Sequence, residues 1–196
     1  MSAGARESAV RKPYSIAAAP EDVRRDGWIE LLVGVDERGE AGAHLPLREG
    51  TLVDIDGPMG SFVFPPSPEE RRFLFIAGGT GIAPLRAMLH HALAIPHREI
   101  GLVYSARTPD DFAYEAEWLA LARDGRIDLR RTITRTGGDA SWQGGRGRIG
   151  RADLQPLVHD PVTLCFVCGP QSMVGDTAKT LEDLGVAPAR IRIEEW

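Results

Sequence analysis

The sequence is poor in cysteine: only Cys165 and Cys168 occur among its 196 residues. Both lie in the strand-like run LCFVCG, and residues three apart on a strand point to opposite faces. A disulfide or a shared metal site is therefore disfavoured, and two thiolates are too few for a four-cysteine iron–sulfur cluster. The five histidines show no metal-binding spacing such as H-E-x-x-H, and His90 and His91 are expected on the surface. The sequence thus predicts no bound metal ion.

Long apolar runs and an excess of positive charge are also missing. No segment approaches the about 20 apolar residues of a membrane-spanning helix, and the stretch MSAGARESAVRK lacks the apolar centre of a signal peptide. The net charge is −5, with acidic and basic residues interspersed, which disfavours a nucleic-acid or anionic-membrane partner. A hydrophobic content of 43% is ordinary for a globular protein, and we expect a cytoplasmic location.

From Arg72 onward, strand-like and helix-like patterns alternate. Apolar runs predict strands at 73–77, 99–106, 127–134, 162–169 and at the closing RIRIEEW; helical spacing predicts helices at 83–94, after Thr108, at 151–158 and at 171–184. Such alternation is typical of right-handed βαβ units. The predicted fold class is therefore α/β, with a doubly wound, five-stranded parallel sheet.

One of these helices carries explicit boundary signals. Thr108-Pro109-Asp110-Asp111 combines an N-cap residue, a proline at the first helical position and a capping-box acid. We expect the helix that begins there to direct one apolar face toward the core, made of Phe112, Ala116, Leu119 and Ala120.

The residues before Arg72 have a different texture, without a long helical pattern. Short strand-like runs (KPYSIAAA, WIELLVG, TLVDIDG and GPMGSFVF) are separated by proline and glycine. Three or four such strands cannot close a barrel by themselves. We therefore predict two domains, a partial antiparallel β-barrel at 1–66 and an α/β domain at 67–196, joined through the polar, proline-rich PPSPEERR.

The stretch GGTGIAP places Gly79, Gly81 and Pro84 between a buried strand and a helix. At such a junction, backbone N–H groups and a helix N-terminus can meet a phosphate group. Glycine lets the backbone approach closely, and proline suits the first helical turn. The pattern favours a dinucleotide diphosphate site, with proline in place of the usual third glycine. The alternative is a tight strand–helix turn without a ligand.

Several motifs occur in a fixed order: KPYS, GPMGSF, GGTGIAP and CGPQSM, before a C-terminal aromatic residue. Together they resemble the ferredoxin–NADP reductase superfamily of flavoprotein oxidoreductases, over almost the whole chain from Arg11. The resemblance implies a β-barrel that binds FAD, here incomplete at its N-terminal side, followed by a domain that binds NAD(P)H. It also implies electron transfer to a separate acceptor, such as ferredoxin, flavodoxin, an oxygenase or a small molecule.

In this family, an R-x-Y-S/T strand lies along the flavin. Lys12-Pro13-Tyr14-Ser15 matches it, with lysine in place of arginine and Arg11 as a second cation. The resemblance implies that Lys12 and Arg11 meet the flavin phosphates, Tyr14 packs on the ring, and Ser15 lies near the reactive nitrogen. Without the other motifs, Tyr14 would be interpreted as a core aromatic.

Two further segments resemble flavin contacts of the family. Gly39 and Gly42 lie where a G-x-x-S turn binds the flavin phosphates, but the serine is missing, so only backbone donors remain. The chain ends with Glu194 two residues before Trp196, as plant-type reductases end with an acid and a terminal aromatic that covers the flavin. Glu194 is thus a candidate for proton supply or positioning. Alternatively, Trp196 is an ordinary aromatic at a strand end.

The remaining motifs resemble the dinucleotide site. The resemblance places the cysteine of CGPQSM beside the nicotinamide ring, which makes Cys168 a candidate catalytic residue together with Ser15 and Glu194. The alternative is a small buried thiol at a strand end. The implied dinucleotide contacts are Gly79, Thr80, Gly81, Pro84, Cys168, Gly169, Pro170 and Met173.

The choice between NADP and NAD depends on the ends of the next two strands. An acid about 20 residues after the glycines would favour NAD, but that window holds Ser105 and Arg107 and no acid before Asp110. Thr134-Arg135 resembles the Ser-Arg pair that grips the 2′-phosphate in NADP-specific relatives, and further arginines follow in the next loop. NADP is favoured, and NAD remains possible.

Three hypotheses follow. The first is an FAD-dependent NAD(P)H reductase that delivers electrons to a separate carrier or oxygenase. The second is a nucleotide-binding module without flavin chemistry, which the altered arginine and the missing serine favour. The third is a fragment or subunit of an electron-transfer complex in which a partner completes the barrel.

Overall fold

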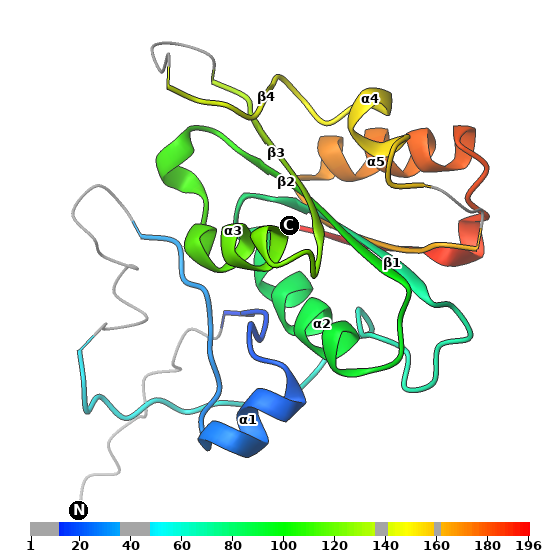
Figure 1. The fold of residues 1–196 in the computed structure, drawn as a ribbon. Helices are drawn as coiled ribbons and strands as arrows, with labels where there is room; N and C mark the ends of the chain where they lie inside the picture. The colour runs from blue at the N-terminus through cyan, green and yellow to red at the C-terminus, as the bar shows by residue number, and fades with distance from the viewer. Residues whose placement is uncertain (1–11, 36–47, 136–140, 159–161) are drawn as a thin grey trace, which may run out of the picture.

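The computed structural model describes residues 12–35, 48–135, 141–158 and 162–196. Within these ranges, the strands form one six-stranded sheet in the order β4-β3-β2-β1-β5-β6 (Figure 1). All neighbouring strands pair in parallel. Their bounds are Arg72–Gly78 (β1), Glu99–Ala106 (β2), Asp128–Ile133 (β3), Gly145–Arg146 (β4), Leu164–Gly169 (β5) and Ile191–Glu195 (β6).

The α/β prediction is confirmed, but the predicted number of strands is wrong. The additional strand is β4, which lies in the glycine-rich loop after β3 and pairs with it through Thr132↔Gly145 and Ile133↔Arg146. Two residues cannot display the alternation from which a strand is recognised in a sequence. The pairing brings this loop to the same edge of the sheet as the end of β3.

Helices cover both faces of the sheet (Figure 1). On one face, α2 (Ile82–Ala94) and α3 (Glu115–Arg123) pack over a core that includes Phe73, Phe75 and Phe166. On the other face, α4 (Arg151–Leu154) and α5 (Gln171–Asp183) cover a second core, around Leu74 and Ile76. Because side chains alternate along a strand, β1 contributes successive residues to opposite cores. The sheet is therefore doubly wound.

The predicted helix after Thr108 is wrong in its start and in its buried face. Its capping box exists, because the backbone N–H and the hydroxyl of Thr108 donate to Asp111 Oδ2 at 2.9 and 2.8 Å. However, it caps only the 3-10 turn η2 (Pro109–Asp111). Tyr114 then adopts a left-handed conformation, with φ of 59°, and α3 begins after it. This break changes the helical phase, so that Trp118 is buried and Leu119 is 43% exposed.

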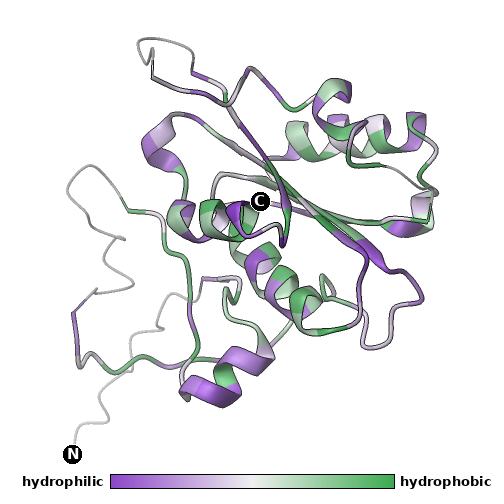
Figure 2. Cartoon of the chain, in the orientation of Figure 1, coloured by the Kyte–Doolittle hydropathy of each residue, from purple (hydrophilic) through white to green (hydrophobic). Residues whose placement is uncertain are grey.

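The predicted partial barrel is not found in the described part of the first 71 residues. That part contains helix α1 (Pro20–Asp26) and one isolated antiparallel bridge, Ile16↔Leu31. Helix α1 is largely hydrophilic in Figure 2. The sequence carries its signals: proline at the first turn, acids after it, basic residues in the last turn, and Gly27 at φ 78° beyond the end. These local signals prevail over the strand-like pattern around them.

The segment before β1 is anchored on the sheet by an aromatic contact. The ring of Phe64 stacks on that of Phe166 at 5.3 Å between centroids, and it also contacts Phe73 at 5.1 Å. Phe166 in turn stacks on Phe75 at 5.3 Å. Phe64 therefore joins the core that α2 covers. The predicted domain boundary at residue 66 stays a prediction.

No helix in the described ranges combines the length and the apolar character that a bilayer-spanning segment requires.

The inward face of α3 gives the first testable prediction. Trp118→Ala removes a fully buried side chain whose Nε1–H donates to Ala113 O at 3.0 Å. We expect the free energy of unfolding to fall by about 3–5 kcal/mol. Leu119→Ala, the control from the face that the sequence pattern had favoured, should lower it by less than about 1 kcal/mol. Urea unfolding followed by circular dichroism measures both values, and a larger loss for Leu119→Ala would contradict the observed phase of α3.

Candidate functional site

The glycine stretch lies where β1 ends next to β5. These strands are neighbours, with Ala77 paired to Cys168, so their carboxyl ends open onto the same edge of the sheet. The fourth strand of the alternating pattern therefore lies beside the first. The 3-10 turn η1 (Gly79–Gly81) follows β1 directly and leads into α2. In open α/β sheets, ligands bind at such an edge.

The backbone of this turn touches the end of β5. A Cβ atom on Gly81 would lie 2.4 Å from the carbonyl oxygen of Cys168. A Cβ on Gly78 would lie 2.6 Å from Met173 Sδ, and one on Gly169 would lie 2.7 Å from Met173 Cε. At Gly81 the obstructing atom belongs to the backbone, so no side chain larger than hydrogen fits without movement of the turn or of β5, whereas at Gly78 and Gly169 the side chain of Met173 would have to move. The glycines therefore bring the two predicted motifs, GGTGIAP and CGPQSM, into direct contact.

The turn also presents donors for an anion. Gly79 has a φ of +53°, which glycine adopts without strain. Gly81 and Pro84 are buried, whereas Thr80 is exposed. The 13-residue helix α2 starts at Ile82, so the positive end of its dipole lies beside the turn, although the Ile82 N–H itself donates to the carbonyls of Gly79 and Thr80. The role of this turn in binding a diphosphate stays a prediction.

Tyr104 fixes the turn from the neighbouring strand β2, and the sequence analysis missed it. Its hydroxyl donates to Gly79 O at 3.1 Å and accepts from the Ala113 N–H at 3.2 Å. Burial raises the pKa of Tyr104 to about 12, so the phenol keeps its proton and remains a donor. A tyrosine inside an otherwise apolar, buried strand needs a partner for its hydroxyl. The tyrosine within this apolar run was therefore the signal in the sequence that could have indicated a structural role for Tyr104.

Two of the predicted catalytic residues lie together at the end of β5 and β6. Cys168 pairs with Glu194 in the sheet, and its thiol lies 3.9 Å from Glu194 Oε2. Burial, aided by the Glu194 carboxylate, raises the pKa of the Cys168 thiol to about 12. Burial also raises the pKa of Glu194 above its usual value. Cys168 is therefore a neutral thiol, and Glu194 holds its proton to higher pH than an exposed glutamate.

Cys165 and Cys168 lie in the cores on opposite sides of the sheet, and both are free thiols. The prediction that they do not form a disulfide is therefore confirmed.

Trp196 lies over the glycine turn. Its indole Cζ2 would be 3.6 Å from a Cβ on Gly79, and its backbone N–H donates to Gly169 O at 3.3 Å. The side chain is 62% exposed, which leaves much of the ring open to stacking. The C-terminal residue thus borders both predicted dinucleotide motifs. Its predicted role against the flavin stays a prediction.

A second group of predicted contacts lies at the carboxyl ends of β2 and β3. The Arg135 N–H donates to Arg107 O at 2.8 Å, and the Thr134 N–H donates to Ala106 O at 3.0 Å. Arg107, Thr134 and Arg135 are exposed, whereas Ser105 is buried. The Gly147 N–H donates to Ile133 O at 2.8 Å, which brings the exposed Arg146 and Arg148 to this edge. Four exposed arginines follow the carboxyl ends of these strands: Arg107, Arg135, Arg146 and Arg148.

The predicted flavin residues are only partly described. Lys12 and Pro13 are exposed, and Tyr14 and Ser15 are half-buried just before the bridge residue Ile16. Three other predicted contacts, Arg11, Gly39 and Gly42, lie outside the described residues. The residues that are described do not form a barrel around a flavin, so their roles stay predictions.

Metal coordination finds no support in the described ranges, where no group of three or more His, Cys, Asp or Glu side chains could hold an ion.

The family model of the oxidoreductase NAD-binding domain matches residues 75–179. "Ferredoxin--NADP reductase B" of Sorangium cellulosum is 34% identical over 198 residues, which cover 95% of this chain and 78% of that protein. "NADH-cytochrome b5 reductase 2" of Scheffersomyces stipitis is 30% identical over 168 residues, covering 83% of this chain but 55% of that protein. This chain thus spans between about half and four fifths of the length of these curated relatives.

Among solved structures, the "Ferredoxin reductase in carbazole 1,9a-dioxygenase" has a TM-score of 0.72 and 26% sequence identity. The match covers 93% of this chain and 54% of that chain. The similarity therefore extends beyond the α/β part that the family model matches.

The close contact at Gly81 gives the second testable prediction. Gly81→Ala forces a methyl group against the carbonyl of Cys168, so the turn or β5 must move. We expect the free energy of unfolding to fall by about 1–3 kcal/mol. Gly175→Ala, in the open interior of α5, should instead raise it by about 0.5–1 kcal/mol. Urea unfolding of both variants measures the difference, and equal effects would show that the turn does not need its glycine.

Proposed function

The chain belongs to the family of FAD- and NAD(P)-binding oxidoreductases that includes ferredoxin–NADP reductases and cytochrome b5 reductases, and we propose that it transfers hydride between NAD(P)H and FAD and passes electrons to a separate acceptor. The acceptor is a ferredoxin, a flavodoxin, an oxygenase or a similar carrier. The observation that carries the proposal is the contact of the glycine turn with the Cys168–Gly169 end of β5. It joins a phosphate-binding turn to the motif proposed for the nicotinamide.

The residues of this edge fit a dinucleotide. Gly79, Thr80 and Gly81 offer backbone N–H groups, and α2 adds the positive end of its dipole to favour a diphosphate. Pro84 pre-forms the first turn of α2. Met173 and Pro170 pack against Gly78 at the base of the turn.

The hydride chemistry is supplied by the nicotinamide and the flavin when they are bound. The protein binds, orients and excludes water. In this proposal, Cys168 offers a neutral, compact thiol beside the nicotinamide, and Glu194, whose pKa burial raises, is the candidate group for proton supply or positioning at the same place. Trp196 offers a ring face for stacking, and Tyr14 and Ser15 fix the flavin.

NADP is proposed over NAD because cations gather where the 2′-phosphate would lie. Arg107, Arg135, Arg146 and Arg148 are exposed at the ends of β2, β3 and β4. Charge-assisted hydrogen bonds from arginine are well suited to a phosphate. The hydroxyl of Thr134 adds a further polar group, although it donates to Ala106 O at 3.3 Å in this structure.

An alternative is favoured by one observation. The described N-terminal residues contain a single isolated bridge and no barrel. The chain would then be an NAD(P)-binding module, or a subunit of an electron-transfer complex without a complete flavin site of its own.

Absorbance spectroscopy tests the proposed function and gives the third prediction. We expect the purified chain to take up FAD and the flavin absorbance to bleach on addition of NADPH, with a weaker response to NADH. A colourless chain that still binds NADPH would contradict the reductase and leave the dinucleotide-binding module. Uptake of FAD only with a second polypeptide would select the subunit.

The cofactor preference has its own prediction. Arg135→Ala should raise the dissociation constant of NADPH about tenfold, because a charge-assisted hydrogen bond is lost, and should leave that of NADH unchanged. Isothermal titration calorimetry measures both constants. Arg123→Ala, at an exposed site on α3 where the side chain pairs with its neighbour Asp124, is the matched control. Equal loss for NADPH and NADH would contradict a contact with the 2′-phosphate.

A further inference from the structure

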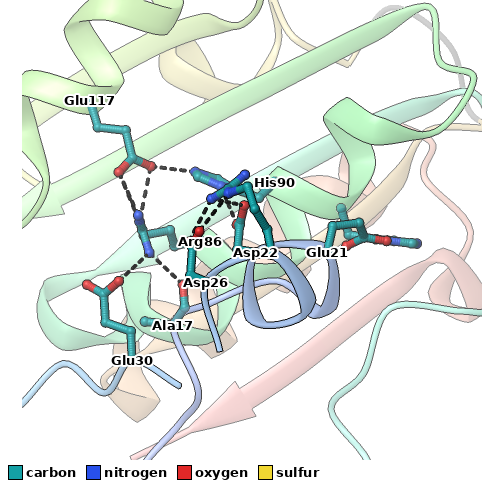
Figure 3. Close-up of polar contacts among 10 residues, drawn as sticks. Ala17, Glu21, Asp22, Asp26, Glu30, Arg86, His90 and Glu117 are labelled. Atoms are coloured by element: carbon teal, nitrogen blue, oxygen red, sulfur yellow. Dashed lines mark hydrogen bonds and ion pairs between the residues drawn. The ribbon is translucent and has the colours of Figure 1, made fainter. Parts of the chain in front are cut away.

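A group of charged side chains joins α1, α2 and α3 (Figure 3). At its centre is Arg86 of α2, whose side chain is only 13% exposed. His90, one turn further along α2, lies beside it. Contrary to the prediction of surface positions, His90 and His91 are each only 25% exposed and both are held by carboxylates.

Arg86 contacts both segments that form the isolated β-bridge Ile16↔Leu31. Its Nη1 donates to Ala17 O at 2.8 Å and to Glu30 Oε2 at 3.0 Å. Ala17 and Glu30 are themselves joined, because the Ala17 N–H donates to Glu30 O at 2.8 Å, next to the bridge Ile16↔Leu31. One guanidinium therefore fixes the position of this bridge relative to α2.

The other side of the guanidinium is held by α3. Arg86 Nε lies 3.0 and 3.1 Å from the two carboxylate oxygens of Glu117, and Nη2 lies 2.9 Å from Oε2. The guanidinium carbon also lies 4.4 Å from the ring centre of Tyr114. A planar fork can satisfy all of these partners together, which a lysine ammonium cannot.

His90 links the same elements through two carboxylates. Its Nδ1 lies 2.9 Å from Asp22 Oδ2 in α1, and its Nε2 lies 2.6 Å from Glu117 Oε1 in α3. A neutral imidazole has only one N–H, so only the imidazolium can donate to both. Charged groups of several elements surround the His90 imidazole: Asp22, Arg25 and Asp26 of α1, Glu30, Arg86 of α2 and Glu117 of α3. Several of them line a cavity of about 70 Å³. The ion pair of His91 with Glu21 lies alongside.

These contacts connect the two ends of the proposed site. Arg86 follows Pro84 by two residues on the helix that starts at the glycine turn, and Ala17 follows Ser15 by two residues. We propose that Arg86 is a positioning residue that fixes the segment bearing Tyr14 and Ser15 relative to α2, the helix that follows the glycine turn. These contacts form a joint between the segment and α2, and protonated His90 stabilises it. This inference rests on the proposed function for its catalytic consequence. The joint itself does not.

The joint should weaken as the pH rises. The hydrogen bond that His90 makes to Glu117, together with the one it makes to Asp22, raises the pKa of His90 above its usual value, although burial and Arg86 oppose this. A group whose pKa is raised on folding stabilises the folded state fully below its unfolded pKa of about 6.5. That stabilisation is lost as the pH rises through the higher folded pKa. Arg86 keeps its charge throughout this range.

Hydrogen exchange measures the joint without any cofactor and gives the final prediction. In the whole chain, we expect the protection factor of the Ala17 amide to fall about tenfold between about pH 6 and about pH 9. His90→Gln should remove this pH dependence, and Arg86→Lys should lower the protection about tenfold at both values. His97→Gln and Arg123→Lys, at exposed sites, are the matched controls and should behave as wild type.

Amides of β1 and β5 in the same experiment report global unfolding, so a variant that fails to fold is recognised. A variant chain with intact sheet protection and unchanged Ala17 protection would overturn the joint. Persistence of the full pH dependence in His90→Gln would overturn the role of the imidazolium.

Stopped-flow reduction of bound FAD by NADPH measures the catalytic consequence. We expect Arg86→Lys to lower the rate constant of flavin reduction at saturating NADPH about tenfold or more, because hydride transfer depends on the alignment of the nicotinamide with the flavin. The dissociation constant of NADPH should stay within about twofold of the wild-type value. An unchanged rate with lost Ala17 protection would overturn the positioning role. A wild-type chain that takes up no FAD would contradict the proposed function alone, and Ala17 protection would still decide whether Arg86 holds the segment.

Discussion

The architecture of the site depends on one close approach, that of the turn after β1 to the end of β5. With a Cβ on Gly81 only 2.4 Å from the Cys168 carbonyl, the two backbones touch without side chains between them. This contact sets where α2 begins and which N–H groups it offers, and it brings Met173 beneath Gly78. Tyr104 then fixes the turn from β2 through Gly79 O. The predicted phosphate-binding and nicotinamide-binding motifs are therefore one rigid unit.

Regular elements that are long and strongly patterned were predictable from the sequence. The bounds predicted for β2 and α2 agree with the structure within one residue, because β2 is largely apolar and α2 has both a glycine start and helical spacing. Strand β4 was not predictable, since two residues carry no period and its pairing depends on β3. The helical phase of α3 was not predicted because Tyr114 interrupts the helical conformation at a position that carries no glycine or proline signal. Only the tertiary position of Trp118 explains that break.

The candidate site likewise contains features that were predictable from the sequence and features that were not. Glycines and a cysteine in fixed spacing could be read from the sequence because each imposes a local backbone or chemical constraint. The polar contacts that hold the site together could not, since their partners are distant in the chain. Arg86 meets Ala17 across 69 positions and Glu117 across 31. Nothing in the local pattern of α2 distinguishes this arginine from one that faces solvent. Its importance arises from burial of a charge, which is stable only when every donor has a partner.

The N-terminal residues are held on the α/β layer by two contacts of different physical character. At one end, Phe64 stacks on Phe166 and meets the ring of His91 in α2 edge-on, at 5.2 Å between ring centroids, so this contact is mainly one of packed rings. At the other end, Arg86 and His90 form ion pairs that depend on an imidazolium. Between them, large apolar side chains stay exposed, with Leu52 at 98% and Met59 at 78%, and add little to the attachment. In the proposed joint, a rise in pH therefore weakens the attachment near Tyr14 and Ser15, because the ion pairs of His90 lie at that end.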